Sequence, residues 1–408
     1  MNENEMIDWK AACVALGFSF CALAPLPGLA QTATPEAAEE QLGDKQRLLA
    51  EVISDVLVPS RLPEIYADLR RAVRDAYLPA MRDIVSGAVP GSKELGAEEI
   101  ESFEKTAALL DYTLRASDEL EPFLAKNKDA IIGDIATLHA KYLTAEEIEA
   151  LGELAEMPAM RKIFNTGYTA SRLVTGYSYE DMRSYYLQAD WLNDVRKRLQ
   201  EMPGLTPDAP PPSQEKIAKA SAIITDLLRV SRIDEMVAEL MRFGREVKIE
   251  AGNGQDGSQE AEQNQLEWFE FFYNLQKSFV LATGPSMLAA MFDEEQLERL
   301  HLLVLSPVIG KTFGMLYETV RAATSLTGDD VRALQAFSEE AESKGLFEKR
   351  TPEQEKQLGD ETQALADIWW ERARQHLTPE TREGLDKAIA DFERMESFRN
   401  LKTPRRDL

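Results

Sequence analysis

The sequence predicts an all-α protein, organised as two related helical-bundle units in tandem with additional C-terminal helices. Three observations lead to this class. Helix-start signals recur along the chain, and apolar residues follow them at helical spacing. Segments with the alternating apolar and polar residues of a half-buried β-strand are nearly absent.

Each helix-start signal combines a capping residue with acidic or amide residues in the turn that follows. The cap oxygen accepts a hydrogen bond from an otherwise unpaired amide of the first turn, and acidic residues interact favourably with the helix dipole. After one such cap, Ile148, Leu151 and Leu154 form an apolar stripe. The signals begin at Thr144, Asp293, Thr327, Thr351 and Thr378.

Residues 1–30 have the pattern of a secretory signal peptide. Lys10 is followed by an uncharged apolar run from Ala11 to Ala30 that ends in small residues. A positive start, an apolar stretch and a small-residue cleavage site define such peptides, so we expect cleavage after Ala30 and a periplasmic protein. An uncleaved amino-terminal membrane anchor is the alternative, because the run is about long enough to span a bilayer.

Composition limits the chemistry of the processed chain. Both cysteines, Cys13 and Cys21, lie in the signal segment, so we expect no disulfide, no thiolate metal site and no cysteine nucleophile. A formal net charge of −25 disfavours nucleic acid and anionic lipid as partners. No second apolar run reaches membrane-spanning length, so we expect no stable membrane span in the mature chain.

Composition also suggests where the units begin and end. We expect a first helical unit over residues 31–201, a second over 214–326 and a C-terminal helical extension over 327–408. The segment 202–213 is rich in proline and is typical of a semi-rigid linker. The segment 250–263 is rich in Gly, Asn, Gln and Asp and predicts a flexible loop.

Two blocks of sequence recur in the same order in both units. Leu48–Leu69 aligns without gaps with Lys219–Leu240, at a shift of 171, and Leu143–Tyr168 aligns with Phe292–Tyr317, at a shift of 149. Leu and Glu match by chance in amphipathic helices, but prolines, lysines and aromatic residues do so less often. The pattern therefore indicates an internal duplication. Identical pairs include Ser60/Ser231, Arg61/Arg232, Glu64/Glu235, Pro158/Pro307, Lys162/Lys311 and Tyr168/Tyr317.

The second unit carries Phe292-Asp-Glu-Glu-Gln-Leu297, then Leu305-Ser-Pro-Val-Ile-Gly-Lys311. These segments resemble the exported bacterial family catalogued as domain of unknown function 2059, whose pattern is F-T-x-E-E-L followed by F-Y-x-S-P-x-G-x-K. The family-like core covers residues 290–317, with a weaker copy at 141–168. Leu305 departs from the family pattern because it replaces an aromatic residue. The resemblance implies a helical envelope protein and supplies no activity.

Motifs for catalysis and metal binding are incomplete. Glu298 and His301 have the spacing used by di-iron carboxylate bundles, but neither of the other two histidines follows a glutamate at this spacing. Ser213 and Lys216 match one element of the serine acyl-enzymes, yet the other elements are missing, so we interpret Ser213 as a helix cap. We expect no catalytic residue, no cofactor site and no metal site.

Two further features allow a structural or a functional interpretation. Ser306 precedes Pro307, so we expect Ser306 to cap a helix, and its replacement by Ala to cost on the order of 1 kcal/mol. Lys162 and Lys311 lie near the expected helix starts, where the alternative to a structural role is the binding of an anion.

Aromatic residues gather in three places. We interpret them as large core residues, and the alternative is a hydrophobic ligand groove or a dimer contact. The first cluster surrounds more than one face of a single expected helix, which is usual for a helix buried centrally or at an interface. The clusters are Trp268, Phe269, Phe271, Phe272 and Tyr273; Tyr177, Tyr179, Tyr185, Tyr186 and Trp191; and Trp369 with Trp370.

These observations favour a non-catalytic periplasmic module that binds an unknown envelope protein or a small hydrophobic ligand. An envelope hydrolase that uses carboxylates alone is the first alternative, because the many acidic residues could hide a catalytic pair. A purely structural homodimer is the second. Two buried carboxylates in one pocket would favour the hydrolase, whereas an apolar groove would favour binding.

Overall fold

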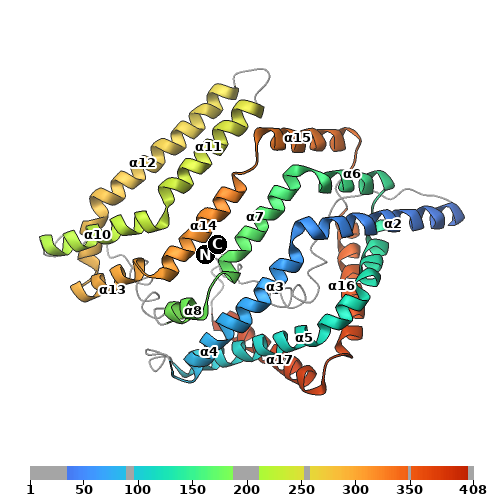
Figure 1. The fold of residues 1–408 in the computed structure, drawn as a ribbon, viewed down its shortest axis with the longest axis horizontal. Helices are drawn as coiled ribbons and strands as arrows, with labels where there is room; N and C mark the ends of the chain where they lie inside the picture. Colours follow the sequence, from blue (N-terminus) through green and yellow to red (C-terminus); the bar gives the residue numbers. More distant parts are fainter. Residues whose placement is uncertain (1–34, 89–95, 187–210, 252–257, 348–350, 403–408) are drawn as a thin grey trace. The chain divides into compact units, whose positions relative to one another are not determined.

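A computed structural model describes residues 35–88, 96–186, 211–251, 258–347 and 351–402. Every regular element in these ranges is helical (Figure 1), which confirms the predicted all-α class. The helices are α2 Pro35–Ser60, α3 Leu62–Ala72, the π-helical turn η3 Val73–Tyr77, α4 Leu78–Val85, α5 Ala97–Ala140, α6 Ala145–Glu156, α7 Pro158–Thr175, α8 Tyr179–Tyr186, α10 Gln214–Ser231, α11 Ile233–Ala251, α12 Ser258–Met291, α13 Glu294–Val304, α14 Pro307–Ala323, α15 Gly328–Ser343, α16 Pro352–Arg374 and α17 Pro379–Lys402.

The predicted helix starts are confirmed. Thr144, Asp293 and Thr351 each form a reciprocal capping box, in which the cap side chain accepts an amide hydrogen bond and the third helical residue bonds back to the cap. Thr327 accepts a hydrogen bond from the amide of Asp330 at 3.2 Å. Thr378 caps α17 in the same way and accepts from the amide of Thr381 at 3.3 Å.

The described chain forms two compact units. The first contains the residues up to Phe164 together with those from Gln335 onward, and the second contains Asn165–Leu334. These limits differ from the expected 31–201, 214–326 and 327–408. The C-terminal helices α16 and α17 pack on α5 and so belong to the first unit. The end of α7 packs on α14 in the second unit, where Arg172 pairs with Glu318 at 2.8 Å.

The first unit is built around the long helix α5. Helices α2, α4, α16 and α17 all pack against it. One core cluster joins α2, α5 and α16 and includes Ile53, Ile132 and Trp369, whose indole nitrogen donates to Asp134 at 3.1 Å. A second cluster joins α5 to α17 and includes Leu120. Trp369 is buried as the sequence predicts, and Trp370 packs against the same clusters.

The second unit has its core between α10, α12 and α13. Ala289, Phe292 and Leu297 from the end of α12 and from α13 pack against the apolar face of α10. Gly284 lets α12 approach α10 closely, because a Cβ atom at this position would lie 2.7 Å from Cδ1 of Ile224.

The matched sequence blocks have the same local geometry. Arg61 and Arg232 each follow a helix in the left-handed conformation, with φ of 55° and 52°. The serine before each arginine is buried and donates its hydroxyl to a carbonyl three residues earlier. Each arginine also pairs with a glutamate three residues later, Glu64 and Glu235 respectively. Equivalent sequence therefore gives equivalent bends between α2 and α3 and between α10 and α11.

Two expected segments differ from the structure or lie partly outside it. The flexible loop expected at 250–263 is shorter, because α11 continues to Ala251 and α12 already begins at Ser258. The linker at 202–213 is described only from residue 211, where the chain is not helical. The signal segment 1–30 lies outside the described residues.

Ser306 does not cap α14 with its side chain, so this prediction is wrong. Its backbone has the extended conformation of a cap, with ψ of 145°, but its hydroxyl makes no cap hydrogen bond. The buried Oγ has no hydrogen-bond partner. The backbone geometry of Ser306 and Pro307 therefore starts α14 without the hydroxyl.

No single helix in the described ranges is long and apolar enough to span a membrane. The pair α13 and α14 passes the same test only when taken together, and the two helices are bent by 47° at their junction.

Gly384→Ala should destabilise the first unit. An added Cβ atom would lie 2.0 Å from the ring of Tyr112, and a rigid ring cannot yield as a flexible side chain does. We expect the free energy of unfolding in urea to fall by about 1–3 kcal/mol. Gly359→Ala on α16 is the matched control, because its Cβ atom meets nothing within 4 Å and Ala favours the helix. Equal effects of the two substitutions would contradict this packing.

Ser306→Ala should leave the free energy of unfolding of the second unit unchanged or raise it by about 1 kcal/mol, because it removes a buried hydroxyl without a partner. Asp293→Ala in the same unit should lower it by about 1 kcal/mol, because it removes a capping box. Urea unfolding followed by circular dichroism would compare the two. A loss from Ser306→Ala as large as that from Asp293→Ala would restore the capping role.

Candidate functional site

The candidate site is one face of α12. The opposite face of this helix is attached to α11 by hydrogen bonds and ion pairs. Tyr273 donates its hydroxyl to Asp234 of α11 at 2.6 Å, and Lys277 pairs with the same carboxylate at 2.7 Å. Glu270, one turn earlier, pairs with Arg245 of α11 at 2.9 Å. These contacts attach one side of α12 to α11 in the part of the helix that precedes its packing on α10.

The other side of α12 is apolar and exposed. Four of its residues, namely Trp268, Phe272, Leu275 and Phe279, follow one another at spacings of four, three and four. Together with Phe271 they lie on one side of the helix, within roughly a quarter to a third of its circumference. Phe271 adjoins the same stripe, and Phe269, Val280 and Leu281 lie beside it, also exposed. We call the following five residues the α12 stripe, with their exposed fractions: Trp268 57%, Phe271 56%, Phe272 50%, Leu275 51% and Phe279 61%.

The aromatic rings of the stripe contact each other. The ring centroids of Trp268 lie 5.8 Å from Phe271 and 5.6 Å from Phe272, and those of Phe271 and Phe272 lie 6.0 Å apart. These distances and the tilted or edge-on orientations are favourable for aromatic pairs. The amino-terminal half of the stripe is therefore one continuous apolar surface.

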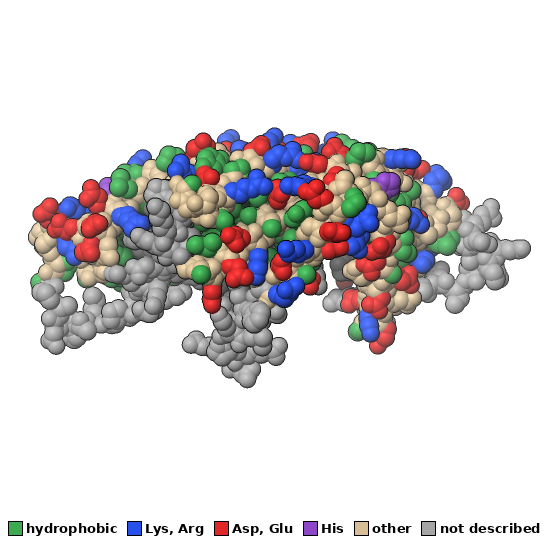
Figure 2. Space-filling view, turned by 90° about the horizontal axis from the view of Figure 1, so that it is seen from below, with side chains coloured by type: hydrophobic (Ala, Val, Ile, Leu, Met, Phe, Trp, Pro, Cys, Tyr) green, Lys and Arg blue, Asp and Glu red, His purple; other side chains and the backbone are tan. Residues whose placement is uncertain are grey.

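Charge is scarce along this part of α12. Between Trp268 and Met291 the only charged residues are Glu270 and Lys277, and both are engaged by α11. The surface elsewhere differs, because 29% of the chain is charged. Figure 2 shows acidic and basic side chains interspersed over the face that it displays. An exposed apolar patch without charges is typical of an interaction site.

The expectation that the first aromatic cluster belongs to the core is wrong. Trp268, Phe269, Phe271 and Phe272 are all about half exposed. The sequence did not single out Leu275 and Phe279, which complete the stripe. Their spacing from Trp268 and Phe272, together with the missing charges, was the signal that could have identified them.

The second aromatic cluster is only partly described. Tyr177 exchanges a hydrogen bond of 2.9 Å with Thr312 of α14. The side chains of Tyr185 and Tyr186, and the whole of Trp191, lie outside the described residues. This cluster therefore supplies no site that can be built from contacts.

Lys311 does not present a free cation for an anion. Its ammonium pairs with Asp181 of α8 at 2.5 Å. Burial alone would raise the pKa of Asp181, but hydrogen bonds from Lys311 and Ser178 lower it. The structure thus gives Lys311 a structural partner within the second unit. Lys162 lies in α7.

Glu298 and His301 do not form half of a metal site. His301 pairs instead with Asp226 of α10, at 2.8 Å from its Nε2 atom. A hydrogen bond from His301, with another from Arg229, lowers the pKa of Asp226. The described residues contain no group of three or more His, Cys, Asp or Glu side chains that could hold a metal ion.

Ser213 and Lys216 lie at the start of α10, and Ser213 is the cap that the sequence predicts. Its hydroxyl accepts a hydrogen bond from the backbone amide of Lys216 at 3.2 Å. A serine nucleophile needs the side chain of a base within hydrogen-bonding distance. The contact that the structure provides is instead a backbone contact of the kind that starts a helix.

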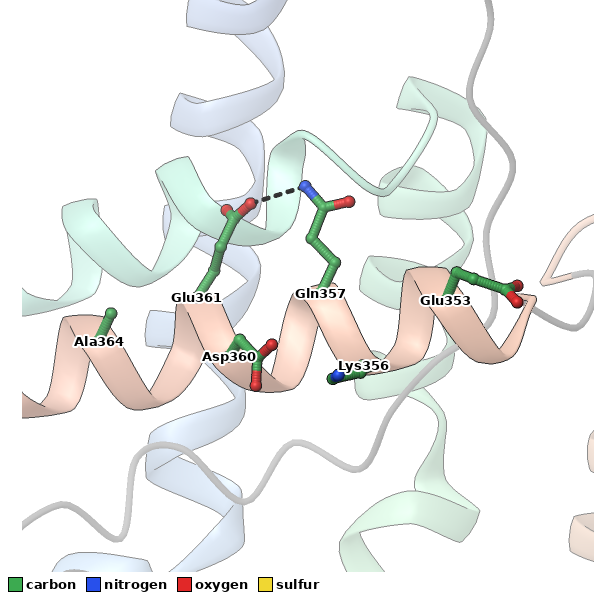
Figure 3. Close-up of a pocket in the computed structure, with 6 residues that line it drawn as sticks. All are labelled: Glu353, Lys356, Gln357, Asp360, Glu361 and Ala364. Atoms are coloured by element: carbon green, nitrogen blue, oxygen red, sulfur yellow. Dashed lines mark hydrogen bonds between the residues drawn. The ribbon is translucent and has the colours of Figure 1, made fainter.

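An open hollow beside α16 is lined mostly by acidic and other polar residues (Figure 3). All of its lining comes from this one helix, namely Glu353, Lys356, Gln357, Asp360, Glu361 and Ala364. A hydrogen bond from Gln357, with others from Lys141 and Tyr142, lowers the pKa of Glu361. A catalytic acid needs a raised pKa, so this carboxylate is suited to a structural role.

The pKa values of the other perturbed carboxyl groups are lowered as well. Every described carboxyl group with a clear shift has a lowered pKa, because hydrogen bonds and cationic neighbours outweigh burial. Such groups stay ionised and serve as acceptors, which gives no support to a hydrolase that needs a protonated carboxyl. They are Glu101, Glu119, Asp181, Asp226, Asp234, Glu235, Glu340 and Glu361.

The attachment of α12 to α11 can be followed by titration. Burial, with the hydrogen bond to Asp234, raises the pKa of Tyr273 to about 12. A raised folded-state pKa gives a stability contribution that is complete below the ordinary value of 10.0 and lost as the pH rises through about 12. We expect ultraviolet titration to show this ionisation, Tyr273→Phe to remove it, and Asp234→Asn to move it toward 10.0. An unchanged titration in Asp234→Asn would contradict the contact.

No family model matches the chain, and neither a curated protein nor a solved structure matches it. The resemblance to domain of unknown function 2059 therefore remains a prediction from its motifs. The feature of the described chain that indicates a function is the exposed apolar face of α12.

Proposed function

We propose that this chain is an exported, internally duplicated and non-catalytic helical protein that binds a partner through the α12 stripe. The observation that carries this proposal is the exposure of five large apolar side chains on one side of a helix whose other side is bound to its own unit. Export rests on the signal-like segment 1–30, with its apolar run from Ala11 to Ala30.

The duplication is supported by geometry as well as by sequence. The bends at Arg61 and Arg232 have the same backbone conformation and the same neighbouring contacts. The second block begins just after the long helices, and its shift of 149, continued back into them, pairs Ala140 of α5 with Ala289 of α12. Both alanines are fully buried near the ends of their helices. This supports equivalent places for the two long helices in the proposed copies.

Under this proposed correspondence, α12 differs from α5 in what covers it. At a shift of 149, the stripe residues Trp268 and Phe272 correspond to Glu119 and Phe123 of α5. Glu119 accepts hydrogen bonds from Thr378 and Thr381 at the start of α17. Phe123 lies in the clusters that join α5 to α16 and α17, with its ring centroid 6.2 Å from that of Trp369.

The C-terminal helices α16 and α17 thus cover one face of α5. The corresponding face of α12, which carries the stripe, is exposed. The main described neighbours of α12 are α10 and α11, and the stripe points away from the contacts with α11. Covering five half-exposed apolar side chains removes them from water, which favours association. We infer that the α12 stripe takes an apolar, helix-like partner in the place that α16 and α17 fill on α5.

Photo-cross-linking tests this proposal in cells that produce the protein. A benzophenone amino acid in place of Phe272 or Phe279 should form cross-linked species under light, because both side chains lie at the interface. The same amino acid in place of Val58, which is 81% exposed on α2, is the matched control and should form few. Equal yields at Phe272 and Val58 would refute a partner at the stripe.

A further inference from the structure

The α12 stripe is suited to one particular partner, and this inference rests on the proposed function. We infer that the partner is the α12 helix of a second copy of the chain, packed antiparallel across a two-fold axis. Three properties of the stripe support this assignment: its spacing, its lack of charge and its area.

The spacing of four of the five stripe residues is symmetric. Trp268, Phe272, Leu275 and Phe279 follow one another at intervals of four, three and four residues, which is the spacing by which helices pack side by side. The sequence of intervals reads the same in both directions. An antiparallel copy therefore places Trp268 opposite Phe279 and Phe272 opposite Leu275, so that one surface complements itself, as a two-fold interface requires.

The charge distribution favours a second copy over other partners. A chain with a net charge of −25 repels itself wherever acidic residues meet. Along the middle of the stripe this repulsion is weak, because the exposed neighbours Asn274, Gln276 and Ser278 are uncharged. The exposed Glu267 lies at its amino-terminal end, and Glu270 pairs with Arg245 of α11, so a cationic protein would find few free complementary charges here. A membrane surface is disfavoured, because interfacial helices carry Lys and Arg on their polar face.

The exposed area is sufficient for a specific contact. A large aromatic side chain offers roughly 150–250 Å², so the five stripe residues, each about half exposed, supply about 500 Å² per copy. Two copies together reach the ~1,000 Å² that a specific interface needs. Phe269, Val280 and Leu281 extend the same surface and are also exposed.

Molar mass in solution is the first test. Sedimentation velocity over a range of concentrations should show the full chain at twice the mass of one copy. Leu275→Asp should give the mass of one copy with an unchanged helical circular dichroism spectrum, because it places two like charges near the axis. Val58→Asp, outside the stripe, should keep the doubled mass. A single-copy mass for the unaltered chain at all concentrations, or a doubled mass for Leu275→Asp, would overturn the inference.

Disulfide trapping tests the direction of the pair. In a chain that carries Ser at Cys13 and Cys21, Trp268→Cys and Phe279→Cys are prepared as separate proteins. Mild oxidation of their mixture should give a disulfide-linked pair, whereas each protein alone should not. Like positions are eleven residues apart along an antiparallel pair, which is roughly 16 Å. Efficient linkage of each protein to itself would indicate a parallel pair and overturn the antiparallel arrangement.

The two proposals fail in different ways. A chain of single-copy mass that still forms cross-links at Phe272, but not at Val58, would refute self-association and leave partner binding in place. A chain of single-copy mass without cross-links at Phe272 would refute both.

Discussion

Apolar packing along one long helix is the interaction on which each unit depends. In the first unit, α2, α4, α16 and α17 pack on α5. In the second unit, α10 packs on α12. Hydrogen bonds and ion pairs also link the helices, but the described residues contain no disulfide. The two cysteines lie in the segment 1–30, and the described residues hold no group suited to a metal ion. Buried apolar area, at about 25 cal/mol per Å², must therefore supply the main stabilisation.

The two long helices, α5 and α12, differ in how much of their surface is covered by other helices. α5 ends in the buried Ala140, α12 has the buried Ala289 two residues before its end, and a capping box follows each helix. They differ in what covers their sides. The chain continues beyond the second unit into α16 and α17, and these helices pack on α5 rather than on α12. The first unit thereby has its long helix covered by its own chain, whereas α12 of the second unit keeps an exposed apolar face.

Many carboxylates of this acidic chain accept hydrogen bonds that cap helices or connect one helix to another. Glu147 is 2% exposed and accepts hydrogen bonds from the amides of Thr144 and Phe347, at 2.7 and 2.9 Å. Asp234 holds Tyr273 and Lys277 and so fixes which side of α12 faces inward. Because the hydrogen bonds from Lys277 and Tyr273 favour the ionised form of Asp234, they lower its pKa. The acidity of the chain is thus used for caps and attachments between helices.

The sequence by itself determined the helical class and the helix starts, because capping depends on residues three apart in the chain. Thr144, Asp293 and Thr351 begin helices as their patterns predict. Only the tertiary structure decided that the Ser306 hydroxyl does not cap α14, because it is buried without a hydrogen-bond partner. It also decided which side of α12 is exposed and that α16 and α17 cover α5. Burial and orientation depend on neighbours far away in the sequence, and the local pattern of aromatic residues on α12 suits a core and an interface equally well.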